Sequence, residues 1–284
     1  AIVLNASPFK SRYALWAEKI DDAIDDDLSD VEYVQWGNRL QTVILDVYTE
    51  KTGRHAQPVH PYEIALPLNP SLSFMGASLD GQQLIDGTGK RCPVEIKAVG
   101  VHQRHEWKDG PPLHYQIQVQ HQMAVIGAPM GTIVVLIGGQ KMLHFDVDRN
   151  ERFIETMIDE ESKFWQLVVE RRPPEPVDGS YSTSQAIAKL YPRGNGEVVE
   201  LDESYCAWAD KYMKANALLK KIEAVKDEAG NNLKAAIGPN AAAILPDGRE
   251  ITYYEQHRNG YTVQPTTFRT LRMPKSQKPK FITN

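Results

Sequence analysis

Apolar and polar residues alternate along several short stretches of the chain. In residues 92–100, Val94 and Ile96 are apolar, while Glu95 and Lys97 stand between and after them. This alternation is typical of a β-strand with one buried face. It places the side chains of Glu95 and Lys97 together on the opposite face of that strand.

Longer stretches show apolar residues every three to four positions, which predicts helices. Such stretches cover residues 7–19, 34–50, 114–127 and 150–170. Ser7 is the expected N-cap of the first helix, with Pro8 in its first turn. Gly53 and Gly127 are expected to end the second and third helices, because glycine is the usual residue after a helix C-terminus.

The strands are expected in two groups. Residues 72–100 predict a β-meander whose first strand ends near Asp80, whose second strand covers 82–86, and whose third contains Glu95 and Lys97. Residues 131–139 and 141–149 predict a further strand pair. Helices first, then strands, a helix and more strands predict an α/β (α+β) fold with a central mixed sheet flanked by helices.

The C-terminal third differs in character. Residues 171–183 are rich in proline and predict a linker, and residues 203–238 predict two helices broken near the sequence AGNN. A hairpin is expected over 241–256. We therefore expect a core over residues 1–178 and an accessory region over 179–284 with helices, a hairpin and a basic tail.

Composition narrows the class of protein. The 284 residues are 42% hydrophobic and 24% charged, as in ordinary globular proteins. No apolar run reaches the roughly 20 residues that span a bilayer, so no membrane is expected. The two cysteines are too few for a disulfide framework, which favours a cytoplasmic setting. The net charge of −5 gives no general argument for nucleic-acid binding.

Asp80, Glu95 and Lys97 form the candidate chemical site. Adjacent strands lie about 4.8 Å apart, so carboxylates on neighbouring strands can converge on one divalent cation. Carboxylate and carbonyl oxygens suit Mg²⁺ or Mn²⁺. A lysine beside the metal can stabilise charge that develops on a phosphate. The alternative is a solvated strand face with a cross-strand ion pair.

Several separated segments resemble one family. SLDG at 78–81 and VEIK at 94–97 look like the core of the PD-(D/E)xK nucleases. NASPFKSRYALWAEK, WGNRLQTVILDVYTEKTG and HYQIQVQHQMAVIGAP resemble motifs of the YqaJ-type viral recombinases, the phage alkaline exonucleases that include lambda exonuclease. The resemblance covers roughly residues 1–178.

This resemblance implies roles for residues at matching positions. Asp80 and Glu95 would be metal ligands together with the backbone carbonyl of Ile96, and Lys97 would be the catalytic lysine. The cofactor would be Mg²⁺ or Mn²⁺, with two ions per site.

Further residues follow from the same resemblance. Gln118 would be the core glutamine of the helix behind the site, and Tyr115 lies one turn earlier on the same helix face. Gln41 stands where the family usually has glutamate, so it would reach the metal through a water.

Candidate DNA contacts lie in two segments. The family's upstream segment with a phosphate-binding arginine does not precede Ala1 here, which leaves Ser7, Lys10 and Arg12 as candidates for a terminal phosphate. Arg104, Trp107 and Lys108 stand in the polar loop before the Gln118 helix, where a DNA strand can pass and a base can stack on the tryptophan.

The function implied is a phage or prophage exonuclease in the host cytoplasm. It would degrade one strand of linear double-stranded DNA from the 5′ end, leaving 3′ overhangs for recombination. Its partners would be DNA ends and a single-strand annealing protein, and it would assemble as a ring-shaped trimer. The alternatives are an endonuclease on the same core and a DNA-binding protein weakened in catalysis by Gln41.

Overall fold

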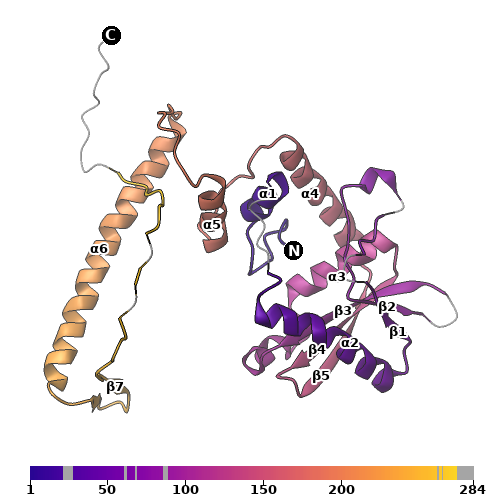
Figure 1. The fold of residues 1–284 in the computed structure, drawn as a ribbon, viewed down its shortest axis with the longest axis horizontal. Helices are drawn as coiled ribbons and strands as arrows, with labels where there is room; N and C mark the ends of the chain where they lie inside the picture. The colour runs from indigo at the N-terminus through magenta and orange to yellow at the C-terminus, as the bar shows by residue number, and fades with distance from the viewer. Residues whose placement is uncertain are drawn as a thin grey trace, which may run out of the picture. The chain divides into compact units, whose positions relative to one another are not determined.

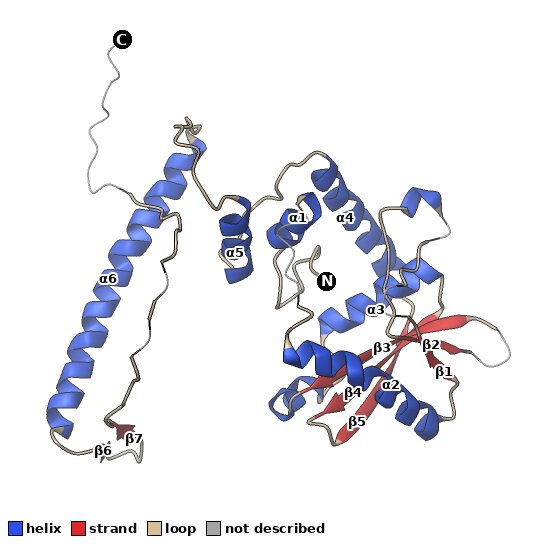
Figure 2. Ribbon diagram, in the orientation of Figure 1, coloured by secondary structure: helices blue, strands red, loops and turns tan. Residues whose placement is uncertain are grey.

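The computed structural model describes residues 1–21, 28–60, 63–67, 69–85, 89–260, 262–263 and 265–273. It divides into two compact units, Ala1–Tyr191 and Pro192–Asn284, which are described separately. Figure 1 traces the chain and Figure 2 distinguishes helices from strands. Part of the acidic stretch at 18–32, part of the turn at 86–90 and most of the basic tail lie outside the described residues.

Two helices open the first unit. Helix α1 spans Arg12–Ile20, and its N-cap is Ser11, whose side chain accepts a hydrogen bond from the Ala14 N–H at 3.0 Å. The predicted start at Ser7 is therefore wrong, because the Ser7 hydroxyl instead accepts from the Phe9 N–H in a local turn at 3.2 Å. Helix α2 spans Glu32–Thr52 and ends at Gly53, which has a φ of 70°, confirming the second predicted helix.

Five strands form the central mixed sheet in the order β1-β2-β3-β4-β5 (Figure 2). Their bounds are Ala56–Pro58, Gly81–Leu84, Arg91–Val99, Met130–Ile137 and Lys141–Asp148. Only β3 and β4 pair in parallel, and the other neighbours are antiparallel. This confirms the predicted fold class, a central mixed sheet flanked by helices.

The strand expected directly before Asp80 is wrong. In the described part of 63–80 the chain makes the short 3-10 turn η2 at Pro70–Leu72 and one isolated bridge between Ala65 and Ala77. The partner of β2 on that side is β1, which comes from much earlier in the chain.

The parallel pair β3 and β4 is joined by a crossover on one face of the sheet. It contains the 3-10 helix η3, Val101–Trp107, and helix α3, Leu113–Ile126, which ends at Gly127 as predicted. Val119 of α3 packs closely on β4, where a Cβ added to Gly131 would lie 2.3 Å from the Val119 Cγ1. Helix α2 packs on the opposite face. The sheet is thus covered on both sides (Figure 1).

Two more helices complete the first unit. Helix α4 spans Glu151–Val169 and α5 spans Tyr181–Leu190. Helix α5 is tied to α1 because the Thr183 hydroxyl donates to Ser11 Oγ at 2.7 Å. The compact unit therefore extends beyond residue 178, while the expected functional boundary at that residue stays a prediction.

The second unit consists of one long helix and a small hairpin. Helix α6 runs without interruption over Ser204–Ile237, so the predicted break near AGNN is wrong. The helix continues because alanine, lysine, glutamate and leucine around Gly230 are strong helix formers. Strands β6, Ala242–Ile244, and β7, Glu250–Thr252, form the predicted hairpin. Among the described residues, no helix is both long and apolar enough to cross a membrane.

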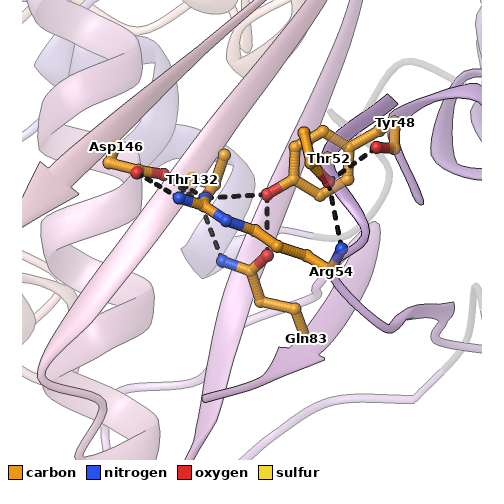
Figure 3. Close-up of polar contacts among 6 residues, drawn as sticks. All are labelled: Tyr48, Thr52, Arg54, Gln83, Thr132 and Asp146. Atoms are coloured by element: carbon orange, nitrogen blue, oxygen red, sulfur yellow. Dashed lines mark hydrogen bonds and ion pairs between the residues drawn. The ribbon is translucent and has the colours of Figure 1, made fainter. Parts of the chain in front are cut away.

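A polar network ties α2 to three strands of the sheet, and Figure 3 shows it in close-up. The guanidinium of Arg54 donates to both carboxylate oxygens of Asp146, at 2.6 and 2.7 Å. Asp146 also accepts from the Thr132 hydroxyl at 2.9 Å, and Thr132 accepts from the Gln83 amide at 2.8 Å. The Tyr48 hydroxyl closes the circuit by donating to Gln83 at 2.8 Å. Buried Gln83 and Thr132 are therefore satisfied through partners that reach the surface.

Replacing Asp146 with asparagine should lower the free energy of unfolding by about 1 kcal/mol at pH 7. The Arg54 hydrogen bond holds the pKa of Asp146 below its ordinary value of 3.8, although partial burial acts the other way. A depressed folded pKa means that this stability is present above pH 3.8 and disappears as the pH falls through the lower folded value. Urea unfolding of wild type and variant between pH 7 and pH 2.5 measures the difference.

The exposed Glu155→Gln on α4 serves as the control and should change little at either pH. A wild-type advantage over Asp146→Asn that stays constant down to pH 2.5 would contradict the assignment.

Candidate active site

Asp80 lies where β2 begins, beside the middle of β3. Because Gly81 pairs with Val94, the preceding Asp80 is level with Glu95 and Ile96. The Ile96 N–H donates to Asp80 Oδ2 at 2.8 Å, and the Gln41 side-chain amide donates to Asp80 Oδ1 at 2.9 Å. The carboxylate of Asp80 is therefore fixed by one donor from β3 and one from α2.

Glu95 also has both carboxylate oxygens bound, by residues of β3 and α3. Its side chain is 2% exposed, and Oε1 forms an ion pair with the ammonium of Lys97. Oε2 accepts a hydrogen bond from the Gln122 amide at 2.6 Å. The alternation in β3 thus places Glu95 and Lys97 on one face as predicted, but that face is buried rather than solvated.

Electrostatics show that the two carboxylates are costly to keep ionised together. Burial and the charge of Glu95 raise the pKa of Asp80 to about 7, although Lys97 and the Ile96 N–H act in the opposite direction. Burial acts to lower the pKa of Lys97, but Glu95 and Asp80 outweigh it and the pKa is raised. The site thus has two carboxyl groups and only one ammonium, so a further positive charge would stabilise their ionised forms.

Gln122 is a site residue that the sequence interpretation missed. It lies one turn after Gln118 on α3, is 2% exposed, and its amide also lies 3.3 Å from the Ser78 carbonyl. Its Oε1 is buried and has no hydrogen-bond partner among the described residues. The i to i+4 spacing from Gln118 was the available signal, since such residues share a helix face.

The residues present fit a divalent cation of the magnesium class. The buried carboxylate of Glu95, the half-buried carboxylate of Asp80 and an unpartnered buried amide oxygen are the hard oxygen donors that such ions take. Within the described residues, no group of three or more His, Cys, Asp or Glu side chains gathers to hold a metal. A bound ion would therefore depend on Asp80 and Glu95 together with neutral oxygens and water.

A cleft of about 900 Å³ borders this group at Lys97 and Gln122. Its lining includes Lys97, Tyr115, Gln118, Gln122, Ser7 and Trp165. The Lys97 Nζ lies 5.0 Å from the centroid of the Tyr115 ring, so this ring supports the ammonium. The structure thereby brings the predicted Tyr115, Gln118 and Ser7 to the same cleft as Lys97.

Lys10 and Arg12 lie elsewhere. Both line a neighbouring cleft of about 620 Å³ that Ser7 also borders. Lys10 is paired with Glu18 at 2.5 Å, and the Arg12 guanidinium lies 5.7 Å above the Phe164 ring. Their predicted contact with a terminal phosphate stays a prediction.

Arg104, Trp107 and Lys108 border a third cleft of about 740 Å³. Trp107 is only 2% exposed and stacks on Tyr115 and Phe145, with ring centroids at 5.5 and 6.2 Å. It therefore has no open ring face for a nucleotide base in this structure, and it supports Tyr115 instead. The DNA contacts expected of Arg104 and Lys108 stay predictions.

Comparison with known proteins identifies proteins to which this chain is similar. Residues 1–129, which include Asp80, Glu95, Lys97 and Gln118, match the model of the YqaJ-like viral recombinase domain. The chain is 22% identical over 239 residues to the uncharacterized protein YqaJ of Bacillus subtilis (strain 168), covering 82% of this chain and 72% of the relative. The family resemblance predicted from the motifs is thus confirmed over residues 1–129.

Two solved structures align with part of this chain. An alkaline exonuclease (LHK-Exo) from Laribacter hongkongensis aligns with a TM-score of 0.40 and 19% identity, over 63% of this chain and 98% of that one. A phage related exonuclease from Haemophilus somnus 129PT aligns with a TM-score of 0.38 and 14% identity, over 56% and 82%.

Replacing Gln122 with leucine should lower the free energy of unfolding by about 1–3 kcal/mol at pH 7 in the absence of divalent ions. The reason is that the buried Glu95 carboxylate loses a donor that nothing replaces. Urea unfolding measures the change. Gln118→Leu on the same helix is the matched control, because the side-chain amide of Gln118 has no hydrogen-bond partner among the described residues. Equal effects of the two substitutions would show that Gln122 does not hold Glu95.

Proposed function

From the recombinase-domain match and the carboxylate pair, we propose that this protein is a metal-dependent nuclease that hydrolyses phosphodiester bonds of DNA. The observation that carries the proposal is the grouping of Asp80, Glu95 and Lys97, of which Lys97 reaches the lining of the cleft. An ordinary surface ion pair has no need of a second acid whose pKa burial raises to about 7.

Asp80, Glu95 and the Ile96 carbonyl are the groups that would hold Mg²⁺ or Mn²⁺, in two ions by the family resemblance. Gln41, which contacts Asp80, and Gln122, which contacts Glu95, would supply neutral donors and acceptors to water around them. When bound, such ions supply Lewis acidity toward a phosphoryl oxygen and lower the pKa of a water molecule.

Lys97 contributes a positive charge to the site and does not act as a general base. Because the two carboxylates raise its pKa, its side chain stays protonated at neutral pH and cannot accept a proton from water. An ammonium fixed at the cleft wall by Glu95 and Tyr115 can stabilise negative charge that develops on a phosphate. The low exposure of Glu95 strengthens the Lys97–Glu95 ion pair, because little water is present to screen the two charges.

The finer features of the proposal follow from the family resemblance. The substrate would be the end of a linear DNA duplex, degraded from its 5′ end to leave 3′ single-stranded overhangs for recombination. A single-strand annealing protein would be the partner, and the assembly would be a ring-shaped trimer. The setting would be the cytoplasm of a bacterial host, with a phage or prophage origin.

Gln41 supports a second candidate function. Its amide donates to the Asp80 Oδ1, so it occupies an oxygen that a cation would otherwise use and brings no negative charge. Weaker metal binding would leave a protein that binds DNA with little cleavage. Gln41→Glu separates the two functions, because an added acid should raise the Mg²⁺ sensitivity of cleavage if the site is catalytic.

In the direct test, wild-type protein with Mg²⁺ or Mn²⁺ should digest linear duplex DNA, leave closed circles intact and stop on chelation. Lys97→Ala should reduce the rate by about 10²–10³-fold, the usual cost of removing one fixed charge donor at a reacting centre. Lys51→Ala, at the exposed end of α2, is the matched control and should digest like wild type. Gel assays on end-labelled DNA measure both rate and polarity.

Each other outcome points to a different conclusion. Cutting of closed circles identifies an endonuclease. DNA binding without digestion in either metal supports the DNA-binding protein. Full activity of Lys97→Ala refutes the site assignment.

A further inference from the structure

Helix α6 stands out because its own unit does not cover it. Over Ser204–Ile237 it has 34 residues, and Ile237 is the only buried one. At 1.5 Å per residue its length is about 51 Å. A long helix in water normally owes most of its stability to packing of an apolar face. In α6 the large side chains of that face stay 39–66% exposed, so the described residues of the second unit leave the face largely uncovered.

Apolar residues of α6 recur at a regular spacing of three and four positions, with one exception. Counted along the helix, the successive stripe positions are Tyr205, Trp208, Tyr212, Ala215, Leu219, Ile222, Lys226, Ala229, Leu233 and Ala236, and only Lys226 is not apolar. Leu218 and Val225 border the same stripe. The interior of a coiled coil has this period of 3.5 residues, sustained here over more than four heptads.

The charged side chains of α6 lie mostly elsewhere. Apart from Lys226, they stand off the stripe, among them Asp210, Lys214, Lys221, Asp227 and Glu228. A stripe with a period of 3.5 residues fits a second helix, because the side chains of two supercoiled helices interlock at that period. Packing on a flat or irregular surface does not require it.

The exposed area is sufficient for a stable contact. The larger stripe and border side chains are 39–66% exposed. Three of them are aromatic and each carries about 150–250 Å², so these alone expose roughly 300 Å². With the five aliphatic ones, the stripe approaches the roughly 800 Å² per partner of a standard protein interface.

We propose that α6 packs against α6 of a second copy of this chain, so that the second unit is a homotypic assembly element. A self-complementary stripe needs no other sequence, and another copy brings a helix of matching length and period. The inference does not depend on the proposed nuclease function, because it uses no residue of the carboxylate site.

Lys226 provides a feature specific to this interface. It occupies an interior position of the stripe, where one polar residue weakens a coiled coil while helping to fix its register. Removing that charge should therefore strengthen the contact, an effect opposite in sign to that of disrupting the stripe.

Sedimentation equilibrium of the full chain over a range of concentrations tests the proposal. Wild type should exceed the monomer mass of 32.0 kDa. Leu219→Asp combined with Ile222→Asp should weaken association at least tenfold, whereas Met213→Asp, off the stripe, should not change it. Lys226→Ile should tighten association by about tenfold, and Lys221→Ile, also off the stripe, should leave it unchanged.

Circular dichroism checks that the doubly substituted helix remains folded. If it does not, the Lys226→Ile and Lys221→Ile pair still decides the question. A wild type that is monomeric at every concentration overturns the proposal, because the stripe is then covered within the chain or by another protein. Association that is insensitive to Lys226→Ile and to the aspartate pair overturns it as well. Since no DNA is present, neither result bears on the nuclease.

Discussion

Two carboxylates held on neighbouring strands, one buried and one half-buried, are the constraint from which the candidate site follows. Asp80 and Glu95 lie on neighbouring strands, and their joint negative charge is opposed by one ammonium, that of Lys97. The surrounding structure is arranged to keep them there. Donors from α2, β3 and α3 fix both carboxylates, and packing of Trp107 behind Tyr115 fixes the ring beside the lysine. This pair of carboxylates is the basis for the cation site proposed above.

Local patterns predicted the parts of the fold that local physics decides. Alternation in β3, the glycines after α2 and α3 and the spacing of α4 were sufficient for those elements. Long-range packing decided other parts. The neighbour of β2 is β1, and Ser11, the cap of α1, is bonded to Thr183 of α5. No short window of sequence contains those two choices. The continuation of α6 through Gly230 is a local effect, because the strong helix formers around that glycine outweigh it.

The same division applies to the site. Asp80, Glu95 and Lys97 could be predicted because their spacing and the family motifs agree. Gln122 was missed, since only the packing of α3 on β3 shows that its amide meets Glu95. The burial of Trp107 could not be predicted from the sequence either, because its neighbours Tyr115 and Phe145 come from different elements. Gln41 is the one departure from the family pattern that contacts the site directly, and it makes metal affinity the decisive property.

A crystal of the wild-type protein grown with Mn²⁺, measured at the manganese absorption edge, tests the central claim most directly. The account predicts an anomalous peak at coordination distance, about 2.0–2.3 Å, from oxygens of both Asp80 and Glu95. It also predicts that the Lys97 ammonium no longer pairs with the Glu95 oxygen that binds the ion. Manganese bound elsewhere, with the Glu95–Lys97 ion pair intact, would contradict the account.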